Sequence, residues 1–155
     1  MDMVEKLVSE DPAIKGIWCV PKYSNPQGYT YSEETVKRFA RLKPAAPDFR
    51  IYWDNAYSVH HLYDGEEKQD FLLEILEECA KAGNPDIVYK FTSTSKISFP
   101  GSGIAAVAAS KANLDDFRKY MTVQTIGHDK LNQLRHVRFF KNLDGVHAHM
   151  SKHAA

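Results

Sequence analysis

Short apolar runs alternate along this chain with stretches of helical periodicity, and this alternation limits the possible folds more than any other feature. The apolar runs cover residues 14–20, 49–53, 86–91 and 104–109. Helical stretches precede and separate them, and three more follow at 112–123, 128–140 and 143–153. Such alternation is typical of an α/β protein in which helices cover a largely parallel sheet. We therefore predict a three-layer α/β/α fold with a mainly parallel sheet.

The predicted helices carry signals for their ends and buried faces. Thr30 and Glu33 have the spacing of a capping box, which predicts a helix from there through Leu42. Its core-facing side chains are predicted to be Val36, Phe39, Ala40 and Leu42. A second amphipathic helix, capped by Gly83, is predicted to carry Phe71, Leu72, Ile75, Leu76 and Cys79. In the 128–140 helix, the core-facing stripe is predicted to be Leu131, Leu134, Val137 and Phe140.

The composition excludes several classes of protein. Twenty Lys and Arg residues balance twenty Asp and Glu residues, so neither nucleic acid nor an anionic membrane is predicted as a partner. No apolar run approaches the roughly 20 residues that span a bilayer. Cys19 and Cys79 form no CxxC pair and the first residues lack a signal peptide, which favours buried free thiols in a cytoplasmic protein. No metal site is predicted, because no Cys or carboxylate completes a set with the three histidines of 147–153.

A polar loop follows each of the first three predicted strands. In open α/β sheets, ligands bind outside the carboxyl ends of the strands. The loop 23–28 contains Asn25, and the loop 54–61 contains Asp54 and Tyr57, followed by two histidines expected mainly to pack. The loop 92–103 contains Lys96, flanked by the hydroxyl residues Ser93, Thr94, Ser95 and Ser98. A lysine in such surroundings can form a Schiff base, and hydroxyls with backbone amides suit a phosphate.

Three short motifs in these loops resemble those of the fold-type I pyridoxal-phosphate aminotransferases of class I/II. Asn25-Pro26-Gln27-Gly28 is similar to their NPxG loop, Asp54-Asn55-Ala56-Tyr57 to their D-x-A/P-Y element, and Ser93-Thr94-Ser95-Lys96 to their S-x-S-K element. Each motif alone is weak, but the three occur in the family's order and each follows a predicted strand. The likeness looks greatest to an aspartate-aminotransferase-like bacterial subgroup.

The resemblance implies a role for each motif residue and pyridoxal 5'-phosphate as the cofactor. Lys96 would form the Schiff base and move the substrate proton, and Asp54 would pair with the pyridine nitrogen. Tyr57 and Asn25 would hydrogen-bond the cofactor's phenolate oxygen, and Ser93 and Ser95 would lie near its phosphate. Without the resemblance, these residues read as ordinary turn and packing residues, and Asp54 as the side chain of an Asx turn.

The resemblance also implies that the chain is only part of a subunit. Residues 1–155 would form part of the large, cofactor-binding domain, without its N-terminal part and without the C-terminal small domain. The family's phosphate-binding cation shortly after the lysine is missing, since the stretch 99–104 contains no Lys or Arg. The isolated chain is therefore expected to be inactive.

The whole protein is expected to be a cytoplasmic homodimer that transfers an amino group between an amino acid, with aspartate as the specific expectation, and a 2-oxo acid. Two other readings stay open at this point. The same motifs serve pyridoxal-phosphate β-lyases and decarboxylases, since fold does not fix chemistry. They also occur in non-catalytic sensing domains of transcription regulators built on this fold. A truncated, inactive remnant is a further alternative.

Overall fold

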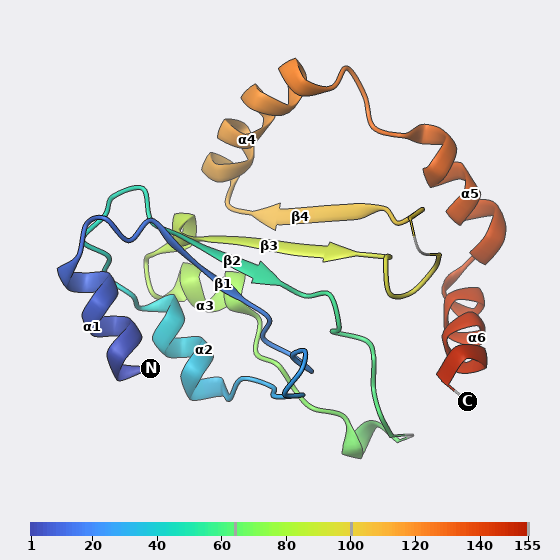
Figure 1. The fold of residues 1–155 in the computed structure, drawn as a ribbon, viewed down its shortest axis with the longest axis horizontal. Helices are drawn as coiled ribbons and strands as arrows, with labels where there is room; N and C mark the ends of the chain where they lie inside the picture. The colour runs from blue at the N-terminus through green and yellow to red at the C-terminus, as the bar shows by residue number, and fades with distance from the viewer. Residues whose placement is uncertain (64, 100, 155) are drawn as a thin grey trace.

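The computed structural model describes residues 1–63, 65–99 and 101–154. In these residues one four-stranded sheet is flanked by helices (Figure 1). Asp64, in the polar loop 64–68, and Pro100, in the stretch after Lys96, lie outside the described residues. The strands are β1 Gly16–Cys19, β2 Arg50–Asp54, β3 Val88–Ser93 and β4 Ala105–Ala109. The α-helices are α1 Asp2–Glu10, α2 Glu33–Ala40, α3 Ile75–Lys81, α4 Lys111–Gln124, α5 Lys130–Phe140 and α6 Leu143–Ala154. Short 3-10 helices cover Glu66–Lys68 and Pro85–Ile87.

The sheet has the order β1-β2-β3-β4, and its first three strands are parallel. This confirms the predicted α/β class and the mainly parallel sheet. The fourth strand departs from the parallel arrangement, because β4 pairs with β3 in the antiparallel direction. Only residues 94–104 join these two strands, and a parallel return needs a crossover of a dozen or more residues.

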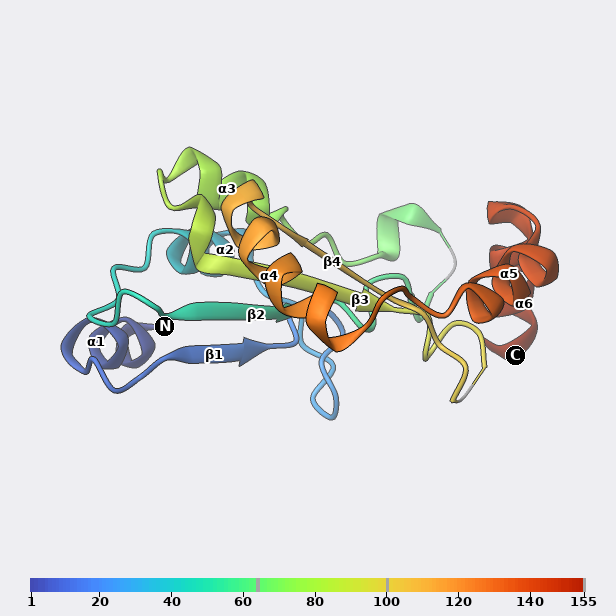
Figure 2. The same cartoon turned by 90° about the horizontal axis from the view of Figure 1, so that it is seen from above.

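The hydrophobic core lies on one face of the sheet, under α1, α2 and α3 (Figures 1 and 2). Ile51 and Trp53 of β2 point into it and are fully buried. The four side chains predicted to face the core from this helix are all buried there, although α2 ends at Ala40 and Leu42 lies beyond it. The predicted cap is wrong by two residues: Ser32, not Thr30, accepts the hydrogen bond from the Thr35 amide. The Thr30 hydroxyl instead accepts a hydrogen bond from the Tyr23 amide.

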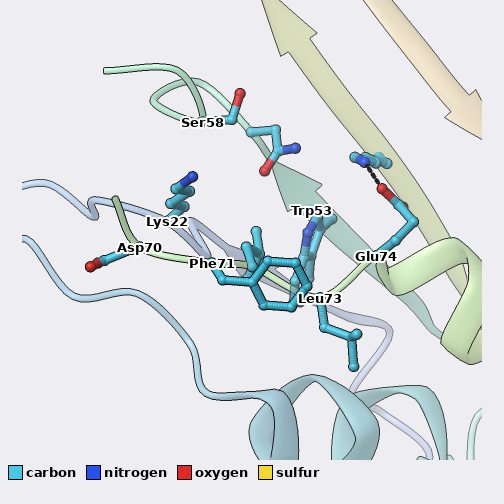
Figure 3. A pocket seen from close by; sticks show the side chains of 10 residues that line it. Lys22, Trp53, Ser58, Asp70, Phe71, Leu73 and Glu74 are labelled. Atoms are coloured by element: carbon cyan, nitrogen blue, oxygen red, sulfur yellow. Dashed lines mark hydrogen bonds and ion pairs between the residues drawn. The ribbon is translucent and has the colours of Figure 1, made fainter. Parts of the chain in front are cut away.

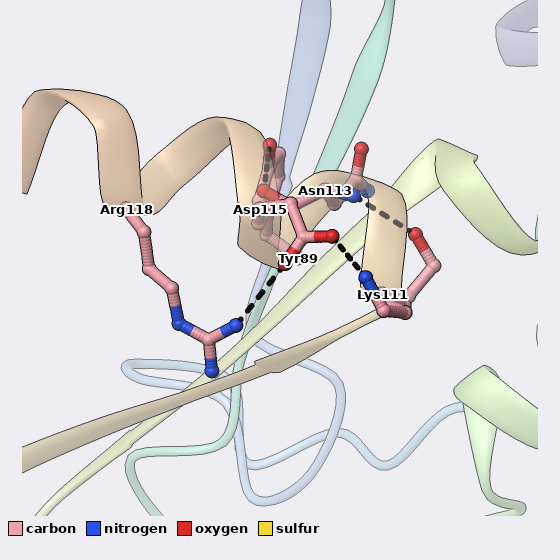
Figure 4. A network of polar contacts seen from close by, with 6 residues as sticks. Tyr89, Lys111, Asn113, Asp115 and Arg118 are labelled. Carbon is pink, nitrogen blue, oxygen red and sulfur yellow. Dashed lines mark hydrogen bonds and ion pairs between the residues drawn. The ribbon is translucent and has the colours of Figure 1, made fainter.

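The opposite face of the sheet carries a row of stacked aromatic rings. Trp18 stacks on Tyr52 at 5.8 Å between centroids, and Tyr52 on Phe91 and Tyr89 at 6.3 Å. The row is open at one end, since Trp18 is 63% exposed, whereas Tyr89 and Phe91 are half-buried. Helix α4 contributes to this face beside Tyr89, whose hydroxyl hydrogen-bonds the carbonyl of Asn113 (Figure 4).

Buried Asn113 anchors α4 to the start of β3. Its amide Nδ2 donates to the carbonyls of Asp86 at 2.8 Å and Val88 at 3.4 Å. On the exposed side of the same helix, Asp115 accepts from Lys111 and from Arg118, one turn to either side (Figure 4). Exposed ion pairs of this kind contribute little to stability. Helix α4 is therefore held to the sheet mainly by the hydrogen bonds of Asn113.

Both cysteines are free and buried, as expected from the sequence. Burial raises the pKa of the Cys19 thiol to about 11 and that of the Cys79 thiol to about 12. Both therefore stay protonated at neutral pH and act as small core residues, because the thiolate is the reactive form.

Replacing Trp53 by alanine is expected to destabilise the fold strongly. Trp53 is fully buried and packs edge-on against Phe39 and Tyr31, so truncation removes its transfer free energy and leaves a cavity. The expected loss is about 3–5 kcal/mol of unfolding free energy. Trp18→Ala is the matched control and should cost about 1 kcal/mol, since it removes mainly ring stacking. Urea titration of the purified chain measures both, and equal losses would contradict the assignment of Trp53 to the core.

Candidate functional site

Three polar loops leave the same edge of the sheet. Strands β1, β2 and β3 run parallel with Cys19 opposite Trp53 and Asp54 opposite Phe91, so their carboxyl ends meet at one edge. The loop after β1 contains Asn25, the loop after β2 contains Tyr57, and the loop after β3 contains Lys96. The sheet therefore brings the three sequence motifs to a common edge, as their positions after strands predicted.

Two adjacent histidines, His60 and His61, tie these loops together. The ring Nε2 of His60 lies 3.0 Å from the backbone carbonyl of Lys96, which joins the second loop to the third. The ring Nδ1 of His61 lies 2.9 Å from the hydroxyl of Tyr23, which joins the second loop to the first. The sequence signal for this bridge was the pair of imidazoles that begins three residues after Tyr57, and their connecting role was missed.

Asp54 ends strand β2 on the aromatic face of the sheet. It is half-buried, and its Oδ1 accepts a 3.1 Å hydrogen bond from the amide of Ala56, which is the bond of an Asx turn. This bond engages only one carboxylate oxygen. Ser93 lies on the same face, because it follows Phe91, the register partner of Asp54, by two residues. Tyr57 is half-buried beside the ring of His60.

Lys96 lies in a single turn that the amides of Ile97 and Ser98 close on the carbonyl of Thr94. It is exposed, as are Ser95 and Asn25. Among the described residues, no hydrogen bond joins the side chains of Asn25, Asp54, Tyr57 and Lys96 to one another. The structure brings their loops together, and the convergence of the side chains on one ligand stays a prediction.

Helix α5 packs against the Lys96 loop with a polar face. Its buried side chains are Asn132, His136 and Phe140, spaced one helical turn apart. The predicted core stripe is therefore wrong except for Phe140, since Leu131 is 73%, Leu134 43% and Val137 65% exposed. The hydroxyls of Thr94 and Ser98 bond the ring of His136, so they are engaged away from any phosphate.

A recess of about 200 Å³ lies on the other side of this edge, on the face of Trp53. Its walls include Asn55 and Ser58 of the second loop, with the Lys90–Glu74 ion pair at one end (Figure 3). None of the predicted site residues lines it, since Asp54 and Ser93 belong to the opposite face of the sheet. The recess is therefore distinct from the predicted site.

Across 1–63, 65–99 and 101–154, no set of three His, Cys, Asp or Glu side chains is arranged to hold a metal ion. No helix in these ranges has both the length and the apolar character that crossing a membrane requires.

Comparison with known proteins agrees with the fold and with the family that the sequence resembles. A family model described as aspartate amino-transferase matches residues 1–155. An aspartate aminotransferase of Corynebacterium glutamicum is 44% identical over 155 residues, which are 100% of this chain and 35% of that protein. The chain therefore belongs to the aspartate aminotransferase family, and it spans about a third of the length of this relative.

Solved structures share the same fold. The crystal structure of an aspartate transaminase from Corynebacterium glutamicum matches 99% of this chain, and 35% of its own, with a TM-score of 0.89 and 43% identity. An alpha-aminoadipate aminotransferase from Thermus thermophilus, complexed with N-(5'-phosphopyridoxyl)-L-leucine, matches 97% of this chain, and 36% of its own, with a TM-score of 0.71. At 22% identity, the second match speaks for the fold alone.

Proposed function

We propose that the protein carrying this chain is a pyridoxal-phosphate aminotransferase. It transfers an amino group from an amino acid to a 2-oxo acid, and Lys96 binds the cofactor covalently. The observation that supports this most is the joining of the D-x-A-Y loop to the lysine loop. His60 bonds the backbone carbonyl of Lys96, and Asp54 lies six residues before His60 at the end of β2. A hydrogen bond thus joins the loop that follows the Asp54 carboxylate to the loop that carries the Lys96 amine, and this cofactor needs both groups.

Asp54 and Lys96 carry the main roles in this proposal. The half-buried Asp54 carboxylate pairs with the pyridine nitrogen and keeps its proton in place, since a partly desolvated carboxylate attracts a cation strongly. The cofactor supplies an electron sink that weakens the bonds at the substrate's α-carbon. The exposed Lys96 amine holds the cofactor and then moves the proton taken from that carbon.

The remaining site residues orient the cofactor. The Tyr57 hydroxyl and the Asn25 carboxamide are donors for its phenolate oxygen. Ser93 and Ser95 offer hydroxyls for its phosphate, and the turn at Lys96 offers backbone amides, which suit an anion. Since the stretch 99–104 has no Lys or Arg, these neutral donors replace a cation at that position.

Aspartate and 2-oxoglutarate are the proposed substrate pair, because a relative at 44% identity is named an aspartate aminotransferase. We further propose a cytoplasmic homodimer, and residues 1–155 as part of its cofactor-binding domain.

The experiment that tests the proposed function is an amino-transfer assay of the full-length protein with aspartate and 2-oxoglutarate. Formation of oxaloacetate and glutamate supports the proposal. When an alanine with an O- or S-linked leaving group on its β-carbon replaces aspartate, release of ammonia and pyruvate would indicate a β-lyase. Carbon dioxide from aspartate would indicate a decarboxylase, and no turnover with a bound cofactor a sensing domain.

The 155-residue chain by itself is expected to bind pyridoxal phosphate weakly and to transfer no amino group. Lys96 and Asn25 are exposed, so the site is open to water, which screens charged contacts. A lost charge-assisted contact costs about 1.5–3 kcal/mol, equal to a weakening of roughly ten- to a hundredfold. Its exposed apolar side chains, among them Val123 and Leu131, should also promote association. Absorbance titration and gel filtration test both points, and tight stoichiometric binding with turnover would contradict them.

A further inference from the structure

Helix α5 buries a polar face although it has an apolar one. Asn132 is 8% and His136 5% exposed, whereas Leu131 and Val137 of the same helix are mostly exposed. Burying polar groups costs free energy unless they are hydrogen-bonded. The hydrogen bonds that these two side chains make therefore decide how α5 sits against the rest of the molecule.

Both hydroxyls that flank Lys96 two residues away bond the same ring nitrogen. The Nε2 of His136 lies 3.1 Å from Oγ1 of Thr94 and 2.8 Å from Oγ of Ser98. The two hydroxyls also lie 3.1 Å from each other, within the turn that contains Lys96. The imidazole thus contacts the buried side of this turn through Thr94 and Ser98, while Lys96 itself is exposed.

The geometry defines the tautomer of the His136 ring. Its Nδ1 lies 2.9 Å from the backbone carbonyl of Asn132, and a carbonyl only accepts, so Nδ1 carries the hydrogen. In the neutral ring Nε2 is then an acceptor with a single lone pair, and the Ser98 hydroxyl can donate instead to the carbonyl of Thr94 at 3.0 Å. The amide of Ile104 donates to Thr94 Oγ1 at 2.9 Å, which leaves the hydrogen of that hydroxyl for His136.

Asn132, one turn earlier on α5, holds the far arm of the same loop. Its Nδ2 donates to the carbonyl of Ser102 at 2.7 Å and to that of Gly103 at 3.2 Å. The approach of the two arms is close, since a Cβ on Gly103 would lie 2.7 Å from the hydroxyl of Ser95. The two buried polar side chains of α5 therefore fix both arms of the lysine loop.

We propose that His136 is a positioning residue for Lys96, acting as a hydrogen-bond acceptor at the base of the turn that carries it. This deepens the proposed function and rests on it, because the position of the amine matters only if Lys96 binds the cofactor. A reactive group held in place by locked neighbours reacts faster than one on a loose loop. Without His136, the turn keeps its own backbone hydrogen bonds but loses its attachment to α5.

The test compares three variants of the full-length protein. His136→Phe keeps a ring in the aromatic slot between Phe99 and Phe140 but removes both hydrogen-bonding nitrogens. His136→Gln restores an acceptor oxygen near the position of Nε2. His128→Phe is the matched control, since His128 is exposed just before α5. Three rates are measured: capture of pyridoxal phosphate at Lys96 followed by borohydride reduction, acetylation of the Lys96 amine, and deuterium exchange of the Thr94 and Ile104 amides.

We expect His136→Phe to slow capture and to speed amide exchange, each by at least about tenfold, equal to about 1.4 kcal/mol. His136→Gln should recover most of both effects, and His128→Phe should match the unchanged protein. Capture and exchange in His136→Phe that equal those of the unchanged protein would overturn the proposal. So would equal losses in the Phe and Gln variants, because they would mean that the ring acts by its shape alone.

Two further arms keep the test decisive. If His136→Phe does not fold, Thr94→Val removes a loop-side partner without touching α5, and it must reproduce the slower capture. If the unchanged protein captures no cofactor at Lys96, the proposed function fails. The acetylation and exchange rates then still decide whether His136 holds the lysine loop.

Discussion

Replacing Lys96 by alanine is expected to abolish covalent attachment of pyridoxal phosphate, whereas Lys90→Ala should leave it intact. Attachment needs a free primary amine, and Lys96 presents one at the carboxyl edge of the sheet. The Lys90 amine is paired with Glu74 and faces the recess beside Trp53, on the other side of the sheet. Both variants should keep the same fold, since neither side chain belongs to the apolar core.

The measurement is borohydride reduction of the full-length protein with its cofactor, followed by mass analysis of the peptides. A phosphopyridoxyl group on the peptide of Lys96 alone is the expected result. A label on any other lysine, or an unchanged label in Lys96→Ala, would contradict the assignment and with it the role of the S-x-S-K element.

Replacing Asp54 is expected to remove turnover while leaving part of the cofactor affinity. Asp54→Ala and Asp54→Asn should each lower kcat/KM by at least about a thousandfold, or about 4 kcal/mol, because both remove the charge that pairs with the ring nitrogen. Asp54→Asn separates the role of the charge from the role of Asp54 in the Asx turn. Its carboxamide oxygen can still accept from the Ala56 amide, as Asp54 does at 3.1 Å.

If Asp54 serves only the Asx turn, Asp54→Asn should be as active as the unchanged protein, and that result would refute the catalytic role. Asp86→Asn is the matched control. Asp86 lies at the opposite end of the sheet, where it accepts from Ser110 at the start of α4. Steady-state kinetics with aspartate and 2-oxoglutarate, together with a cofactor titration, distinguishes loss of chemistry from loss of binding.

The sequence predicted the elements of this fold well because most of them follow apolar periodicity. Helix α2 buries the apolar residues that its pattern indicates, whereas Trp18 of β1 and Tyr52 of β2 stay exposed on the other face of the sheet. Loops with Asn25, Tyr57 and Lys96 follow the strands β1 to β3. The direction of β4 was not predicted, although the 94–104 connection is too short for a parallel return. The length of this loop, in addition to the apolar pattern, could have predicted that β4 is antiparallel to β3.

Helix α5 shows where periodicity fails. Its apolar stripe predicted the wrong buried face, because Asn132 and His136 gain hydrogen bonds to the lysine loop that no hydropathy pattern contains. The same applies to His60 and His61, whose bonds join loops distant in sequence. Such bonds depend on the relative placement of loops, which emerges only when the sheet has formed.

The two tryptophans lie on opposite faces of the sheet, and this gives the protein two separate optical probes. Trp53 is fully enclosed under α2, so its fluorescence emission should lie at short wavelength and respond only to unfolding. Trp18 is 63% exposed at the end of the aromatic row, so its emission should lie at long wavelength and be open to quenching by iodide. Whatever comes to cover that face would shift the Trp18 emission to the blue and leave that of Trp53 unchanged.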